Sequence, residues 1–110
     1  MAYDEALASR VRSALSDVGD LREQKMMGAI CFMVGGNMCC GATGDALMVR
    51  VGRDGYEAAL GQDHVRPMKM SGGRRPRGFV LVDPPGIETE DELKRWITRG
   101  RKFVATLPAK

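Results

Sequence analysis

The chain has 110 residues, of which 44% are hydrophobic and 28% charged, a composition typical of a globular domain and unlike that of a disordered chain. Its length fits one domain, expected over residues 1–110, and no apolar run approaches the roughly 20 residues of a membrane-spanning helix. The net charge of +3 is too small to indicate nucleic acid binding by itself, and the N-terminus lacks the apolar segment of a secretory signal, so we expect a cytoplasmic protein.

The first predicted elements are a helix and an interrupted strand. Residues 4–18 place Leu7, Val11 and Leu15 at helical spacing, and Gly19 is expected to end this helix. Residues 23–34 then combine β-branched and aromatic side chains with a glycine at position 28, which indicates a strand broken by a turn or a bulge.

Two glycine-containing pairs, at positions 35–36 and 44–45, predict a meander of antiparallel strands. Glycine reaches the positive φ angles that two-residue hairpin turns require. With these pairs at the centres of the turns, Phe32 faces Cys39, Cys31 faces Cys40 and Cys40 faces Val49. The turns therefore predict which side chains share a face of the sheet.

This register divides the predicted strands into two faces. The face expected to pack against the core collects Cys31, Met33, Met38, Cys40, Ala42, Leu47, Val49 and Val51. The other face includes Arg50, and a charged arginine is almost never buried without a partner. Because the rest of this second face is apolar, we predict that it binds a protein partner or a second copy of the chain. The residues predicted to form that surface are Ile30, Phe32, Val34 and Met48.

The three cysteines are expected to be reduced thiols. In the predicted register Cys31 and Cys40 are core residues, whereas Cys39 is accessible beside Arg50, whose charge favours the thiolate. Cys39 is therefore the candidate reactive thiol, and a small strand residue without a chemical role is the competing interpretation. Adjacent cysteines point to opposite faces of a strand and His64 is the only other good ligand, so we predict no metal site and no cofactor.

The second half of the chain carries the excess positive charge, with eleven basic and seven acidic residues over positions 55–110. A short helix is predicted over residues 54–60, an edge strand or irregular segment over 63–70, and a buried strand over 79–83. Residues 71–78 form a glycine-rich loop with three arginines, and this loop is the best phosphate-binding candidate, although its spacing differs from that of a P-loop.

The last predicted element is a helix that begins with a capping box formed by Thr89 and Glu92. An apolar stripe continues to Pro108, and Trp96 in that stripe is expected to anchor the core rather than to stack on a ligand. Basic residues off the stripe either solubilise the helix or extend the basic surface of the loop. The predicted basic patch comprises Arg74, Arg75, Arg77, Arg95, Arg99 and Arg101.

The order of elements predicts an α+β fold of two layers, with N- and C-terminal helices on one face of an antiparallel meander sheet. Several segments also resemble one known family: MAYDEALASRVRSAL, MVGGNMCCGATGDALMVRVG, HVRPM, GFVLVDPPG and LKRWITRGRKFVATLP. They resemble the N-terminal domain of the TfoX/Sxy competence regulators, in particular the small single-domain members. The resemblance implies a secretion-chaperone-like fold and a role in regulating natural transformation, where full-length members act as transcriptional coactivators alongside a cyclic-AMP receptor protein.

Three functional hypotheses follow from the sequence. The first is a non-enzymatic regulatory or adaptor domain that binds a protein through the open sheet face, with arginines steering association. The second is a nucleic-acid-associated module in which the basic patch contacts phosphates. The third is a thiol enzyme or sensor at Cys39 with His64 as a remote base. The family has no defined catalytic residues to transfer, and we expect the first hypothesis to hold.

Overall fold

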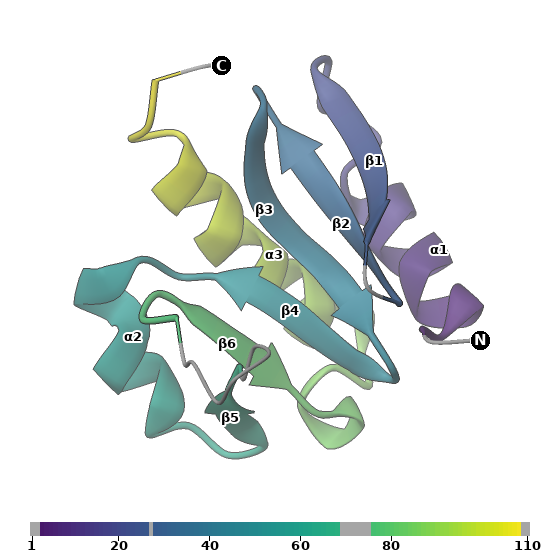
Figure 1. Ribbon diagram of the computed structural model, residues 1–110. Helices are drawn as coiled ribbons and strands as arrows, with labels where there is room; N and C mark the ends of the chain where they lie inside the picture. The colour runs from purple at the N-terminus through teal and green to yellow at the C-terminus, as the bar shows by residue number, and fades with distance from the viewer. Residues whose placement is uncertain (1–2, 27, 69–75, 109–110) are drawn as a thin grey trace.

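Six strands form one antiparallel sheet, and the helices lie on one face of it (Figure 1). The computed structural model describes residues 3–26, 28–68 and 76–108, and it confirms the predicted α+β class. The strand order across the sheet is β1-β2-β3-β4-β6-β5, so the first four strands form a meander. In chain order the elements are α1 (Glu5–Ala14), β1 (Leu21–Met26), β2 (Ala29–Val34), β3 (Asn37–Thr43), β4 (Ala46–Arg50), α2 (Arg53–Leu60), β5 (Val65–Pro67), β6 (Phe79–Val82), η2 (Pro84–Gly86) and α3 (Glu90–Val104).

Side-chain caps explain where the two terminal helices begin. Asp4 accepts a hydrogen bond of 2.8 Å from a backbone N–H in the first turn of α1. The predicted capping box of α3 is confirmed, because the Glu92 N–H donates to Thr89 Oγ1 and the Thr89 N–H donates to Glu92 Oε1, each at 3.1 Å. The end of α1 differs from the prediction: its C-cap is Leu15, and the chain makes further turns before it reaches Gly19.

Glycines in the left-handed region form the turns of the meander. Gly28, with φ of 81°, lies between β1 and β2 and confirms the predicted break in the strand. Gly35 and Gly36, with φ of 60° and 82°, connect β2 to β3, and Gly44, with φ of 58°, connects β3 to β4. Both predicted hairpins are therefore present. Their turns use glycine because other residues rarely adopt these φ angles.

One extra residue in β3 shifts the pairing within the β2–β3 hairpin. The pairs next to the turn are as predicted, but Phe32 then pairs with Cys40 rather than with Cys39. Cys39 is the extra residue of a β-bulge, so every pair beyond it is displaced by one position. The predicted pairing of Cys31 with Cys40 is therefore wrong. The β3–β4 hairpin has the predicted register, with Cys40 opposite Val49.

The bulge changes which side chains of β2 face the helices. A displacement of one residue exchanges the two faces of a strand. Ile30 and Phe32 are 1% and 0% exposed in the core that the helices cover, so the prediction that they form an outer binding surface is wrong. Val34 is partly buried against the same core, whereas Met48 lies on the opposite face, as predicted.

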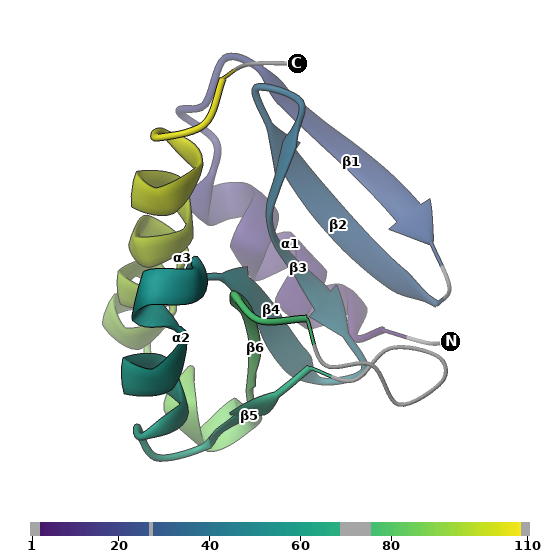
Figure 2. The same cartoon turned by 60° about the vertical axis from the view of Figure 1, so that its left-hand side comes forward.

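The main core lies between the sheet and the helix layer, which Figure 2 shows on one side of the strands. α3 packs on β3 and β4 in the middle of the sheet, α1 packs on β3 and α3, and α2 packs beside β5 and β6. Trp96 is 7% exposed within this core, which confirms that it anchors α3. The helix layer therefore leaves the other face of the sheet without a helix, as far as the described residues show.

Candidate functional site

A second apolar cluster lies on the sheet face opposite the helices. Its buried members are Cys31, Ala46, Met48 and Leu81, and its partly buried members are Met33, Met38, Met68 and Phe79. We call this surface the methionine face. Among the described residues, no helical side chain belongs to it, so strands and one strand-flanking residue form it alone. Methionine side chains are flexible and polarisable, which suits a surface that adapts to a partner.

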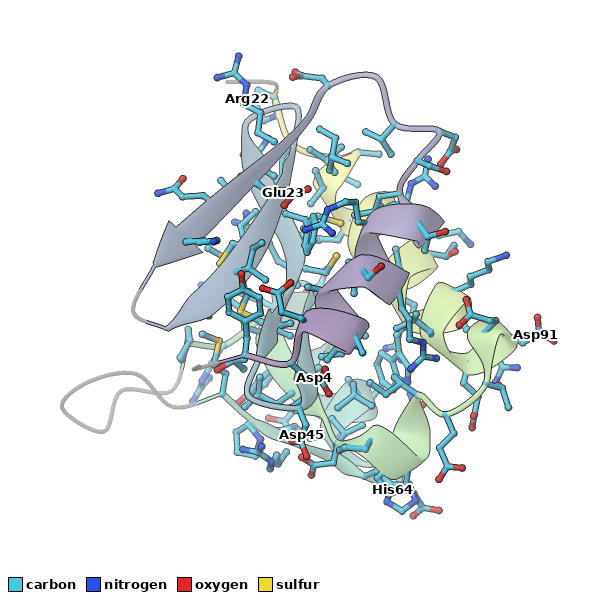
Figure 3. The ribbon with its side chains drawn as sticks, turned by 90° about the vertical axis from the view of Figure 1, so that its right-hand side faces the viewer. Asp4, Arg22, Glu23, Asp45, His64 and Asp91 are labelled. Atoms are coloured by element: carbon cyan, nitrogen blue, oxygen red, sulfur yellow. The ribbon has the colours of Figure 1, made fainter. Side chains whose placement is uncertain are left out.

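Arginines lie directly across the strands from residues of the methionine face. Arg22 pairs with Met33, and Arg66 pairs with Leu81. Arg66 donates to Asp83 at 3.0 Å, whereas Arg22 is exposed and makes no salt bridge among the described residues. Figure 3 shows Arg22 near the top of the view and Glu23, the next residue of β1, on the side of α1. Arg22 therefore places a positive charge beside the methionine face, whereas the charge of Arg66 is balanced by Asp83.

Arg50 is the last residue of β4, one position beyond the last β4 residue that pairs with β3. Its guanidinium lies 5.3 Å from the ring centre of Phe79 and 5.4 Å from that of Phe103, and it donates to the Met38 carbonyl at 3.4 Å. These contacts hold the half-buried charge between an aromatic side chain of the sheet and one of α3. Arg50 therefore lies partly exposed at the end of β4 and not among the buried residues of the core.

The prediction that Cys39 is an accessible thiol is wrong. Cys39 and Cys40 are both 0% exposed, because the bulge turns the two side chains toward the helix-covered core. A hydrogen bond with the Cys40 thiol lowers the pKa of Cys39, and the charges of Arg101 and Arg50 act in the same direction. The same hydrogen bond and burial raise the pKa of Cys40. Burial thus denies a reagent access to a thiol whose charge is otherwise favoured.

The prediction that Cys31 shares the core face with Cys40 is wrong, because Cys31 lies on the methionine face, where burial raises its pKa. All three cysteines are free thiols in the structure. No group of three or more His, Cys, Asp or Glu side chains suited to a metal ion occurs within residues 3–26, 28–68 and 76–108. The buried thiols pack among apolar side chains on both faces of the sheet.

The predicted basic patch divides into parts that lie apart. Arg74 and Arg75 fall outside the described residues, and Arg77 is exposed just before β6. Arg101 donates to Asp17 at 3.1 Å, where the end of α3 approaches the loop after α1. That ion pair directs Arg101 toward a groove of about 440 Å³ between α3, this loop and the β2–β3 turn.

Arg95 and Arg99 instead line a separate cavity of about 320 Å³ between α3, η2 and the loop before β5. We call it the α3 cleft. Trp96 and His64 also line this cleft, and the Arg99 guanidinium lies 4.6 Å from the ring centre of Trp96. The four-residue spacing of Arg95 and Arg99 predicts that they share one side of a helix. The position of His64 beside these arginines is not predictable from local sequence, because the loop that carries it is brought to α3 only by the tertiary fold.

None of the helices described for this chain is both long and apolar enough to cross a bilayer. The family model described as the TfoX N-terminal domain matches residues 13–104, which is most of the chain. No curated protein and no solved structure matches the chain. The match agrees with the element order and with the segments that resemble competence regulators in the sequence. The chain therefore belongs to the TfoX N-terminal domain family, a competence-related regulatory family.

Proposed function

We propose that this domain is a non-enzymatic adaptor that acts in the cytoplasm, within competence-related regulation, by binding a protein partner on the methionine face. The observation that carries the proposal is the apolar cluster on the sheet face that lacks a helix among the described residues. Met33, Met38 and Phe79 are only partly buried there, so they offer apolar area to a partner. Surfaces of this kind mark interaction sites in globular proteins.

Positive charge beside the methionine face favours a partner with acidic groups around an apolar centre. Arg22 and Arg50 both lie beside the methionine face, and neither makes a salt bridge among the described residues. A second copy of the chain would bring the same positive charges together across a symmetric interface. An acidic partner would instead be attracted, and its association rate would fall as the salt concentration rises.

The test is site-specific photo-crosslinking in the host cell, followed by binding measurements with the purified partner. A crosslinking amino acid at Met38 should capture one main protein, whereas the same amino acid at the exposed Glu57 of α2 should not. The captured protein is then identified, purified and titrated against the domain. We expect Met33→Gln together with Met38→Gln to weaken its binding by about tenfold or more, as expected for central apolar contacts.

The matched control is Leu60→Gln, which changes a partly buried apolar side chain on the helix-covered side. It should leave the affinity for the partner unchanged within about twofold. The proposal is wrong if the Met33/Met38 double variant folds, as judged by urea unfolding, and still binds the partner at full affinity. A self-crosslink at Met38 would identify a homodimer instead.

The role in competence has a separate readout. Deleting the gene in its host should change the frequency of natural transformation, and the wild-type gene should restore it. The Met33/Met38 double variant should fail to restore it, while Leu60→Gln should succeed. Direct DNA binding is tested with a duplex at several salt concentrations, because phosphate contacts make affinity fall steeply with salt. Tight, strongly salt-dependent DNA binding by the domain alone would favour the nucleic-acid-associated function.

A further inference from the structure

We propose that the α3 cleft is a binding site for the phosphate group of a small molecule. The cleft has a volume of about 320 Å³, at the lower end of the range of small-ligand pockets. It lies beside the helix layer, on the opposite side of the sheet from the methionine face. The site is therefore independent of the proposed adaptor surface.

Arg99 is held in an orientation that suits an oxyanion. Its guanidinium lies 4.6 Å from the ring centre of Trp96, and the side chain reaches toward Gly55 of α2. Stacking on an indole uses the flat face of the guanidinium and leaves its N–H edge for a bidentate contact. Since Trp96 is 7% exposed, its ring is fixed by the core and fixes Arg99 in turn. The cleft thus contains a pre-oriented donor group.

Arg95 adds a second positive charge to the same wall. Arg95 and Arg99 are separated by one turn of α3, so their side chains lie on the same side of the helix. Among the described residues, neither arginine makes a hydrogen bond or a salt bridge. The other three arginines of α1 and α3, by contrast, each form a salt bridge with a carboxylate. They are Arg10, Arg12 and Arg101.

Two carboxylates, Asp63 and Glu92, also line the cleft. Glu92 Oε1 accepts hydrogen bonds from the Thr89 N–H and the Thr89 hydroxyl, so this carboxylate is engaged by the N-terminus of α3. These bonds lower the pKa of Glu92, and the nearby Arg95 and His64 act in the same direction. Asp63 is exposed on the loop before β5, where water screens its charge. The two guanidinium groups therefore share the cleft with two carboxylates, of which Glu92 is hydrogen-bonded through one oxygen to Thr89 and Asp63 is exposed to water.

His64 completes the cleft from the opposite side. It is the only non-glycine residue of the described part of the chain with positive φ, at 67°. Such a conformation costs free energy and persists where surrounding contacts hold it. The Asp83 N–H donates to the His64 carbonyl at 2.8 Å, and Gly86 leaves room for the histidine, since a Cβ at position 86 would lie 3.3 Å from His64 Cβ. Figure 3 shows His64 at the lower end of the molecule.

The combination favours a compact phosphate group. Two guanidinium groups and one imidazole supply donors to several oxygens at once, as a tetrahedral oxyanion requires. The small volume suits a free phosphate or a terminal monoester. A nucleic acid backbone would instead need a continuous basic track, and Arg101 is directed to a different groove by Asp17.

The test uses Trp96 as a built-in reporter, because it is the only tryptophan of the chain. Inorganic phosphate and phosphoserine are titrated separately into the full chain at constant ionic strength, with indole fluorescence and the indole N–H resonance as readouts. We expect saturable binding of both. Arg95→Gln and Arg99→Gln should each weaken it by about tenfold or more, the usual effect of losing a charge-assisted contact. Arg99→Lys should also bind more weakly than wild type, because lysine keeps the charge and loses the planar edge.

Lys94→Gln is the matched control, since it removes the same charge from an exposed neighbouring position on α3. It should leave phosphate affinity within about twofold of wild type. His64→Asn keeps a residue that tolerates the left-handed conformation and should bind more weakly than wild type. The proposal is overturned by an absence of saturation up to tens of millimolar phosphate, or by equal losses in Lys94→Gln and Arg99→Gln. Duplex DNA that binds through Arg95 and Arg99 while free phosphate does not would overturn it as well.

Discussion

Gly100 allows α3 to lie directly on the bulged part of β3. A Cβ at this position would come within 2.9 Å of the Cys39 carbonyl oxygen and 3.2 Å of Cys39 Sγ. Both atoms belong to a buried strand in the middle of the sheet, so neither can move freely. The absence of a side chain at Gly100 thus determines how closely α3 approaches the sheet.

We therefore expect Gly100→Ala to lower the free energy of unfolding by about 1–2 kcal/mol, because overpacking outweighs the gain in helix propensity. Urea unfolding measures the change. Gly55→Ala in α2 is the control, since its Cβ would meet its nearest neighbour only at 3.8 Å, and it should raise stability by up to about 1 kcal/mol. An unfolding free energy of Gly100→Ala at or above that of wild type would contradict this account.

At the scale of elements, the start of α3 combines a cap with a titratable group. Thr89 and Glu92 satisfy each other's backbone N–H groups, and these hydrogen bonds lower the pKa of Glu92 from its ordinary value of 4.5. A carboxylate whose pKa is lower in the folded state contributes its stabilisation above the unfolded pKa. That contribution is lost as the pH falls below 4.5 and passes through the lowered value.

We expect Thr89→Ala to cost about 1 kcal/mol at neutral pH, which is typical for the loss of an N-cap. Glu92→Gln should also destabilise the domain at neutral pH, and its difference from wild type should shrink as the solution is acidified below pH 4.5. Urea unfolding at several pH values measures both. Thr98→Ala, at an exposed interior position of α3, is the control and should be neutral or slightly stabilising. If the difference in unfolding free energy between Glu92→Gln and wild type grows on acidification, the ionised Glu92 carboxylate does not stabilise the start of α3.

For the whole molecule, the strand order separates a protected centre from two edges. β3 and β4 each have a strand on both sides and α3 above them, whereas β1 and β5 are the outer strands of the sheet. Edge strands have unpaired backbone groups along one side, and local opening exposes the rest more readily. Stability should therefore be distributed unevenly across the sheet.

Native-state hydrogen exchange checks this distribution. Amides of β3 and β4 should exchange slowest, with opening free energies near the global value, and those of β1 and β5 should exchange faster. Rates are compared with intrinsic rates of the unfolded chain, so that sequence effects are removed. Protection of β1 equal to that of β4 would mean that a partner or a second copy covers this edge in solution.

The candidate site was predictable only in part, and β2 shows why. Both faces of β2 are apolar, so no alternation of polar and apolar residues indicates which side is buried. The structure has an apolar cluster on the second face of the sheet, and Met48 belongs to it as predicted. Ile30 and Phe32, which were predicted to lie on that face, lie in the core instead. A single bulge residue, Cys39, produced this exchange, and no local signal distinguishes a bulge from a regular strand here.

The sequence by itself determined the element order, the hairpin turns, the capped final helix and the α+β class, because helical periodicity, glycine turns and caps act over a few neighbouring residues. Only the tertiary structure decided which faces are buried and which distant groups meet. Packing of α3 on β3 buries the cysteine pair, and folding of the loop before β5 brings His64 to Arg95 and Arg99. These outcomes depend on contacts between residues far apart in the chain, which local patterns do not encode.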